Sequence, residues 1–190
     1  MAPRIRVNKE EIVSQAVELV RSGGEAALNA RDIAAGLGCS TQPIFSNFAN
    51  MDELRSEVIA TAERMYRRFI AEEMATGEFP PYKASGMAYV RFAKEERELF
   101  RLLFMRRRSR EEMENDTSEL TADTIRMIRE ATALDAKSAS LLHLEIWSFV
   151  HGIATMIATE YFEPDRELVS RMLTDAYQGF KTRVSQVLID

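Results

Sequence analysis

Residues 30–54, with the sequence ARDIAAGLGCSTQPIFSNFANMDEL, constrain the fold of this chain more than any other stretch. Two short helical patterns, over 30–37 and 41–48, are joined by a glycine-containing turn. We expect Gly36 and Gly38 to end the first helix and to allow the positive φ of a sharp turn. Ser40 is placed to cap the second helix. Two helices joined in this way make the helix-turn-helix pattern of DNA-binding proteins.

The second helix of this pattern has a polar outer side. Ile44, Phe45 and Phe48 supply its apolar positions, and Pro43 falls in the first turn, where a missing N–H costs little. The outer side carries short hydrogen-bonding groups, which are Thr41, Gln42, Ser46 and Asn47. Such groups reach base edges or phosphates.

The longer string LNARDIAAGLGCSTQPIFSNFANMDELRSEV resembles the N-terminal domain of TetR-family transcriptional repressors. The matching elements are Asn29, Ile33 with Ala34, Gly38 with Cys39, Phe45 with Phe48, and Asn50 with Leu54. The likeness covers residues 9–58. It implies an N-terminal DNA-binding domain followed by a helical domain that binds a ligand and dimerises.

Two positions depart from the family pattern. Phe45 stands where the family commonly has tyrosine, and Met51 stands where it commonly has lysine. Both family residues meet a phosphate, and each such hydrogen bond is worth on the order of 1 kcal/mol. We therefore expect weaker DNA affinity with the same binding mode.

Composition indicates an all-α protein of about nine helices. At 190 residues the chain can form one large or two small domains, and it has only eight glycines and five prolines. We expect domains over 1–49 and 50–190, with a long helix over 51–75 linking them. No long apolar run or signal core is evident, and the single cysteine, Cys39, excludes an intrachain disulfide. These features predict a reduced cytoplasmic protein in which Cys39 is buried and inert.

Positive charge is only weakly concentrated at the N-terminus. The net charge is −5, and through residue 50 five basic residues face five acidic ones. The arm with Arg4 and Arg6 is basic and can reach a phosphate or the minor groove. A solvated tail is the alternative. The predicted DNA-binding residues are Arg4, Arg6, Asn29, Arg31, Ser40, Thr41, Gln42, Pro43, Phe45, Ser46 and Asn47.

A second recognisable string, EIWSFVHGIATMIATE over residues 145–160, looks like the C-terminal domain of one TetR subgroup. That likeness implies a small-molecule cavity lined by soft, large side chains. The predicted lining is Met65, Phe69, Phe92, Phe100, Phe104, Trp147, His151 and Tyr177. Each of these is alternatively a core residue, and His151 is more often a satisfied core histidine. We expect no cofactor and no metal, because His143 and His151 lack metal-ligand spacing on one helix.

The last two predicted helices, over 136–162 and 165–187, are more apolar than one intramolecular face requires. Two such helices from each of two subunits make a four-helix bundle. The predicted dimer interface consists of Ile153, Ile157, Met172, Ala176, Phe180 and Val184. A twofold dimer separates two recognition helices as a palindromic operator requires.

The sequence therefore predicts a dimeric DNA-binding repressor, released from a palindromic operator by a small apolar or amphipathic ligand. No nucleophile–base pair, phosphate-binding loop or pair of catalytic carboxylates indicates an enzyme. The open alternative is a helical ligand-binding or adaptor protein whose helix-turn-helix no longer binds DNA. The even charge balance, Phe45 and Met51 favour that alternative.

Overall fold

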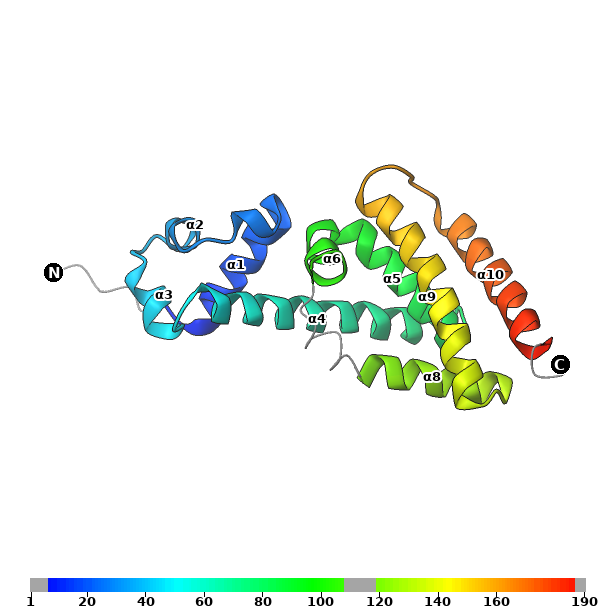
Figure 1. Cartoon of the computed structure of the whole chain (residues 1–190). Coiled ribbons are helices and arrows are strands. Elements are labelled where there is room, and N and C mark those ends of the chain that lie inside the picture. Colours follow the sequence, from blue (N-terminus) through cyan, green and yellow to red (C-terminus); the bar gives the residue numbers. More distant parts are fainter. Residues whose placement is uncertain (1–6, 108–118, 187–190) are drawn as a thin grey trace. The chain divides into compact units, whose positions relative to one another are not determined.

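The computed structural model describes residues 7–107 and 119–186 (Figure 1). Arg4 and Arg6 of the predicted basic arm lie outside these residues. The described residues form α-helices and one short 3₁₀ helix, with no strand, so the all-α fold class is confirmed. The elements are α1 (Lys9–Gly23), η1 (Glu25–Ala27), α2 (Ala30–Gly36), α3 (Gln42–Asn47), α4 (Met51–Ala75), α5 (Pro81–Glu95), α6 (Arg97–Phe104), α8 (Glu119–Thr132), α9 (Ala136–Ala158) and α10 (Arg166–Gln186).

Side-chain caps start several of these helices. Asn8 Oδ1 accepts a hydrogen bond from the Glu11 N–H at 2.9 Å, and the Glu11 carboxylate accepts one from the Asn8 N–H at 2.8 Å. This reciprocal pair satisfies two N–H groups that the first turn of α1 leaves without helical partners. Asp135 caps α9 in a similar way by accepting from the Lys137 and Ser138 N–H groups. The caps explain why α1 and α9 begin at these residues.

The turn between α2 and α3 differs from the prediction at two points. Thr41, not Ser40, is the N-cap residue of α3, and no side chain caps this helix. Pro43 lies in the first turn and has no N–H, so a side-chain cap has one donor fewer to satisfy. Only Gly38 of the two turn glycines has a positive φ, at 63°. Gly36 instead allows close packing, because a Cβ there would lie 2.3 Å from Gln15 Nε2.

The chain forms two compact units, which we describe separately. The first comprises residues 1–67 and 96–106, and the second comprises 68–95 and 107–190. The helix α4 contributes residues to both. In the first unit, α1 packs against α2, α3 and α6. Its fully buried core contains Ile12, Ile33, Ile44, Phe48, Leu54, Val58, Leu99 and Phe100.

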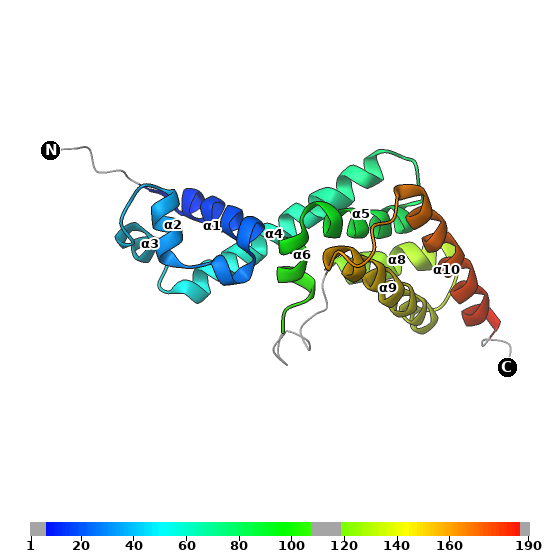
Figure 2. The same ribbon diagram turned by 90° about the horizontal axis from the view of Figure 1, so that it is seen from above.

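In the second unit, α9 contacts α5, α8 and α10, and one of its faces remains open (Figures 1 and 2). Gly86 on α5 allows this close packing, because a Cβ there would lie 3.2 Å from the Leu173 side chain of α10. The buried core residues include Phe92, Leu142, Ile146, Ile153, Ile157 and Leu173. By length and composition α9 could also cross a membrane, but a core helix passes the same test.

A polar cluster joins α10 to the end of α4 within this second unit. Glu73 is only 2% exposed, and Arg166 donates to its carboxylate and to that of Glu78, at 2.6 Å each. Lys83 on α5 donates to Ser170 and Thr174 of α10, at 2.8 Å each. Because Glu73 is buried, removing Arg166 would leave an uncompensated carboxylate. The cluster therefore fixes α10 against the last turns of α4.

Candidate functional site

The recognition helix of the predicted helix-turn-helix is α3, whose two faces are clearly different. Ile44 is fully buried and anchors the helix to the core of the first unit. Gln42 is exposed and Thr41 is half-buried, and neither side chain forms a hydrogen bond within the described residues. Their polar groups are therefore available to an external partner.

Two other predicted contact residues are already bonded to their own helix. The Ser46 hydroxyl donates to the Gln42 carbonyl at 2.9 Å, and Asn47 Nδ2 donates to the Pro43 carbonyl at 2.8 Å. The Ser46 hydroxyl proton and one N–H of Asn47 are used locally, while the side-chain oxygens can still accept hydrogen bonds. Gln42, with a complete uncommitted amide, keeps the largest unused hydrogen-bonding capacity of these side chains.

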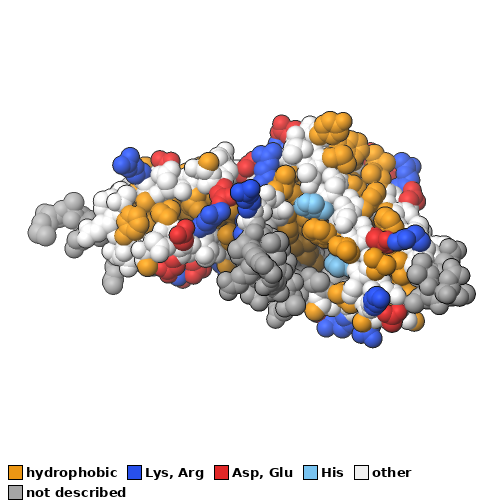
Figure 3. Space-filling model, viewed as in Figure 1, with side chains coloured by type: hydrophobic (Ala, Val, Ile, Leu, Met, Phe, Trp, Pro, Cys, Tyr) orange, Lys and Arg blue, Asp and Glu red, His pale blue; other side chains and the backbone are white. Residues whose placement is uncertain are grey.

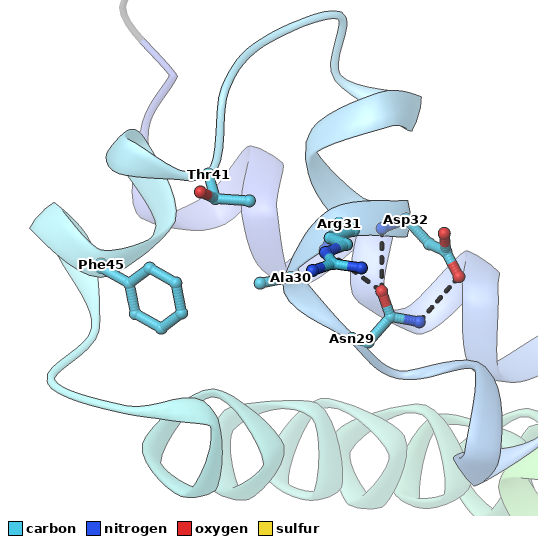
Figure 4. A pocket seen from close by; sticks show the side chains of 6 residues that line it. All are labelled: Asn29, Ala30, Arg31, Asp32, Thr41 and Phe45. Atoms are coloured by element: carbon cyan, nitrogen blue, oxygen red, sulfur yellow. Dashed lines mark hydrogen bonds between the residues drawn. The ribbon is translucent and has the colours of Figure 1, made fainter.

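A groove of about 670 Å³ lies between α3 and the start of α2 (Figure 4). Its lining residues are Asn29, Ala30, Arg31, Asp32, Thr41 and Phe45, all of the first unit. The Phe45 ring is 52% exposed and points from α3 toward Ala30. Four of the predicted DNA-binding residues thus line one groove.

Within this groove, Asn29 and Asp32 are fixed by helix capping. Asn29 Oδ1 accepts from the Arg31 and Asp32 N–H groups at 3.1 and 3.0 Å, and its Nδ2 donates to the Asp32 carboxylate at 2.7 Å. These bonds satisfy the start of α2, so neither side chain is free to reach a ligand. The exposed Arg31 side chain is the group in the groove that can bind a phosphate.

Most other positive charge in this unit is neutralised. Lys9 donates to Glu57 at 2.8 Å, and that hydrogen bond raises its pKa. Arg21 is paired with Glu96 and with Glu18. Over residues 7–50, Arg31 is therefore the one basic side chain without an ion pair. Counting basic and acidic residues in the sequence gives equal numbers up to residue 50, but it does not show which of them form ion pairs.

The predicted ligand-lining residues fall in both units. Met65, Phe100 and Phe104 belong to the first unit, where Phe104 packs edge-on against Tyr66 at 5.3 Å. Phe69 and Phe92 belong to the second and are buried against each other, with ring centroids 5.2 Å apart. Trp147, His151 and Tyr177 also belong to the second unit and are partly exposed.

Sequence reasoning missed two tyrosine–histidine pairs between α5 and α9. The Tyr82 hydroxyl lies 3.3 Å from His143 Nδ1, and the Tyr89 hydroxyl lies 2.8 Å from His151 Nδ1. Burial lowers the pKa of both histidines below 6.5, so the imidazoles are neutral near pH 7. The signal available in the sequence was the spacing on each helix. Tyr82 and Tyr89 are seven residues apart on α5, and His143 and His151 are eight apart on α9.

The residues of the predicted dimer interface differ in how exposed their side chains are in the single chain. Ile153, Ile157 and Val184 are buried within the single chain. Met172, Ala176 and Phe180 on α10 are half-buried. On α9 the exposed apolar side chains are Leu141, Leu144 and Trp147.

Within the described residues, the remaining candidate residues do not form a metal-binding site. Cys39 is half-buried, more accessible than the fully buried thiol that we expected. Within residues 7–107 and 119–186, no three His, Cys, Asp or Glu side chains come together as a set of metal ligands.

Comparison with known families gives a match over residues 82–177 to the model described as Tetracyclin repressor-like, C-terminal domain. These residues make up just over half of the chain. Curated protein sequences give no match.

Solved structures extend the likeness over most of the chain. A TetR-like transcriptional regulator from Rhodococcus sp. RHA1 is 15% identical with a TM-score of 0.69, covering 94% of this chain and 97% of that one. A TetR family member from Streptomyces coelicolor A3 is 16% identical with a TM-score of 0.59, covering 88% and 96%. A multidrug binding protein, EbrR, solved with imidazole, is 19% identical with a TM-score of 0.61, covering 92% and 95%. At these identities the structures establish a shared fold.

Proposed function

Because the chain belongs to the TetR family of transcriptional regulators, we propose that it is a cytoplasmic homodimeric repressor of a palindromic operator. A small apolar or amphipathic molecule bound in the C-terminal domain releases it from DNA. The family consists of transcription factors, not enzymes. Residues 1–49 bind the operator, and residues 50–190 sense the ligand and dimerise.

The exposed face of α3 is the observation that carries the DNA-binding part of this proposal. The Gln42 side chain is exposed with no hydrogen bond to the described residues, and Gln42 follows Thr41, which lines the groove with Arg31 and Phe45. A glutamine amide can bond the N6 and N7 positions of adenine in the major groove. Arg31 supplies a phosphate contact, which positions the helix without reading sequence.

A mobility-shift assay tests DNA binding directly. The probe is the DNA flanking the gene for this protein, and the competitor is unrelated DNA of the same length. We expect a retarded band that resists the competitor. No specific band at micromolar protein in low salt would contradict operator binding at that locus.

The Gln42→Ala variant tests base reading by α3. Loss of a bidentate base contact costs roughly 1–3 kcal/mol at the cognate site and relaxes base preference there. Ser22→Ala on α1 is the control, because Ser22 is exposed, its hydroxyl donates to its own helix, and it is not a predicted DNA contact. Equal binding of Gln42→Ala and the unmodified protein across operator variants would exclude Gln42 as a base reader.

The competing function is a helical ligand-binding or adaptor protein that no longer binds DNA. One observation favours it, namely that Lys9 and Arg21 are paired with carboxylates instead of facing a partner. A negative mobility shift with retained ligand binding would support this competitor.

Dimerisation gains support from two glycines on the outer helices. A Cβ added at Gly152 of α9 or Gly179 of α10 would meet no atom within 4 Å. Glycine in a helix costs roughly 0.5–1 kcal/mol relative to alanine, so packing within one chain gives no reason for it here. Close approach of α9 and α10 from a second copy of the chain would explain both glycines.

A further inference from the structure

The interface between α5 and α9 combines an apolar core with two tyrosine–histidine pairs, which we call the polar rungs. Tyr82 pairs with His143, and Tyr89 pairs with His151. Between these rungs lie buried apolar residues such as Met87 and Ile146. Burying polar groups among apolar ones gains little stability, because each must first lose its hydration. The packing of the two helices therefore does not by itself account for four polar rings.

The chemistry of the first rung leaves one group available. A neutral imidazole has one N–H donor and one acceptor nitrogen. If the Tyr82 hydroxyl donates to His143 Nδ1, the proton of His143 is on Nε2. His143 is half-buried, and its Nε2 makes no hydrogen bond within the described residues. In this tautomer, the pair presents an N–H donor at His143 Nε2.

Aromatic rings lie close to this donor along α9, where Trp147 follows His143 by one helical turn. The Trp147 indole stacks on His151 with ring centroids 5.1 Å apart and an interplanar angle of 15°, and it is 42% exposed. Tyr177 of α10 packs against Tyr82 at 6.1 Å. Figure 3 shows the two histidines, in pale blue, among hydrophobic side chains at the edge of a hollow in this face.

The charged groups described next to these rings favour a neutral ligand over a cationic one. The nearest carboxylate along α9, Glu145, is engaged in an ion pair with Arg183 of α10. Lys181 Nζ lies 5.8 Å from the centre of the Tyr177 ring, so a positive charge stands beside these rings. A cationic molecule would be repelled by Lys181.

We propose that His143, held by Tyr82 and flanked by the Trp147–His151 stack, binds planar aromatic molecules that carry a neutral acceptor oxygen, such as aryl ketones. The aromatic plane packs against the rings, and the oxygen accepts a hydrogen bond from His143 Nε2–H. Tyr82 is a positioning residue, because it acts through the tautomer of His143. This ligand class rests on the proposed sensing function of the C-terminal domain.

The test compares two probes of nearly equal shape, 2-acetylnaphthalene and 2-ethylnaphthalene. Titration calorimetry on the full-length protein measures both affinities. One additional hydrogen bond predicts that the ketone binds about fivefold to tenfold more tightly. His143→Phe should abolish this preference while retaining binding of both probes. Tyr82→Phe should reduce the preference, and it removes only one oxygen, so the fold is preserved.

Tyr161→Phe is the matched control, because Tyr161 is exposed and lies outside the cluster. Its preference for the ketone should equal that of the unmodified protein. Equal affinity for the two probes, absence of binding by either, or a preference that survives both His143→Phe and Tyr82→Phe would overturn the proposal.

Operator binding measured on the same samples separates this inference from the proposed function. A ketone preference without any operator shift would support the ligand site and contradict the repressor function. An operator shift without a ketone preference would do the reverse.

Discussion

In the proposed operator complex, Phe45 and Met51 are the residues that we expect to limit DNA affinity most directly. The ring of Phe45 is exposed in the groove beside Arg31, and Met51 is the half-buried first residue of α4. Neither can donate a hydrogen bond to a phosphate. We predict that Phe45→Tyr and Met51→Lys each tighten operator binding about fivefold, as one added hydrogen bond of about 1 kcal/mol implies.

The salt dependence of binding distinguishes the two changes. The lysine adds one released counterion, so the slope of log K against log salt should steepen by about 0.9. The neutral tyrosine should leave the slope unchanged, and Met51→Gln is the uncharged control at the second position. If neither Phe45→Tyr nor Met51→Lys tightens binding in a salt titration, these positions do not face phosphate.

His143 and His151 make stability depend on pH. Burial lowers the pKa of both below 6.5, so the folded chain binds fewer protons than the unfolded chain in mild acid. The free energy of unfolding should therefore be full above pH 6.5 and fall as the pH drops toward the folded-state pKa. Thermal unfolding between pH 7.5 and 5 measures this decline.

The variant His143→Phe provides the comparison for this pH effect. It should show a shallower decline over the same range, because one of the two protonation sites is gone. An identical decline in both proteins would mean that His143 does not contribute. Trp147 fluorescence offers a second readout, since its indole stacks on His151.

At the scale of helices, local signals determined what could be predicted. The capping box of Asn8 and Glu11 fixed the start of α1. The end of α9 was wrong by four residues, because Glu160 adopts a left-handed conformation with φ of 58°. The N–H of Tyr161 then bonds the Met156 carbonyl and closes the helix. Glycine commonly marks such an end, and none is present here.

The candidate site residues also differ in whether a local sequence signal could predict them. The exposure of Gln42 followed from helical periodicity within one short helix. The Tyr82–His143 pair joins residues 61 positions apart on separate helices. No local pattern identifies such a partner, because the pairing depends on how α5 packs against α9. The ion pairing of Lys9 and Arg21 was unpredictable for the same reason.

In the proposed release mechanism, we expect the continuous helix α4 to carry the coupling, because it contributes residues to both units. Its residues 51–67 belong to the first compact unit and 68–75 to the second. Arg68, at this boundary, is exposed and forms an ion pair with Glu72 at 3.6 Å. We predict that Arg68→Gly preserves operator binding within a few fold but weakens release by ligand, because glycine loosens the helix by about 1 kcal/mol.

Arg68→Ala is the matched control for the Arg68→Gly variant. Both variants lose the same exposed ion pair, which contributes little, but alanine preserves the helix. Operator release is measured at increasing 2-acetylnaphthalene or another inducing probe. Equal release by the glycine and alanine variants would show that α4 does not carry the coupling through this point.

At the scale of the whole molecule, the proposed dimer would compensate for the small number of positive charges available to DNA. The net charge is −5, and over residues 7–50 both Lys9 and Arg21 are paired with carboxylates. A single copy would neutralise few phosphates and so gain little affinity. Two linked copies on a palindrome add their contacts, because the second binds at a high effective concentration.

Phe180 on α10 gives the sharpest test of that dimer. It is half-buried in one chain, so an introduced charge can be solvated in a monomer but would be desolvated in a packed interface, at a cost of several kcal/mol. We predict that Phe180→Asp sediments as a folded monomer and loses most of its operator affinity. Tyr161→Asp, at an exposed site, should remain dimeric, whereas Ile153→Asp should unfold because Ile153 is buried within the chain. A folded wild-type monomer at micromolar concentration, or a Phe180→Asp protein that remains a dimer, would place the interface elsewhere or remove it.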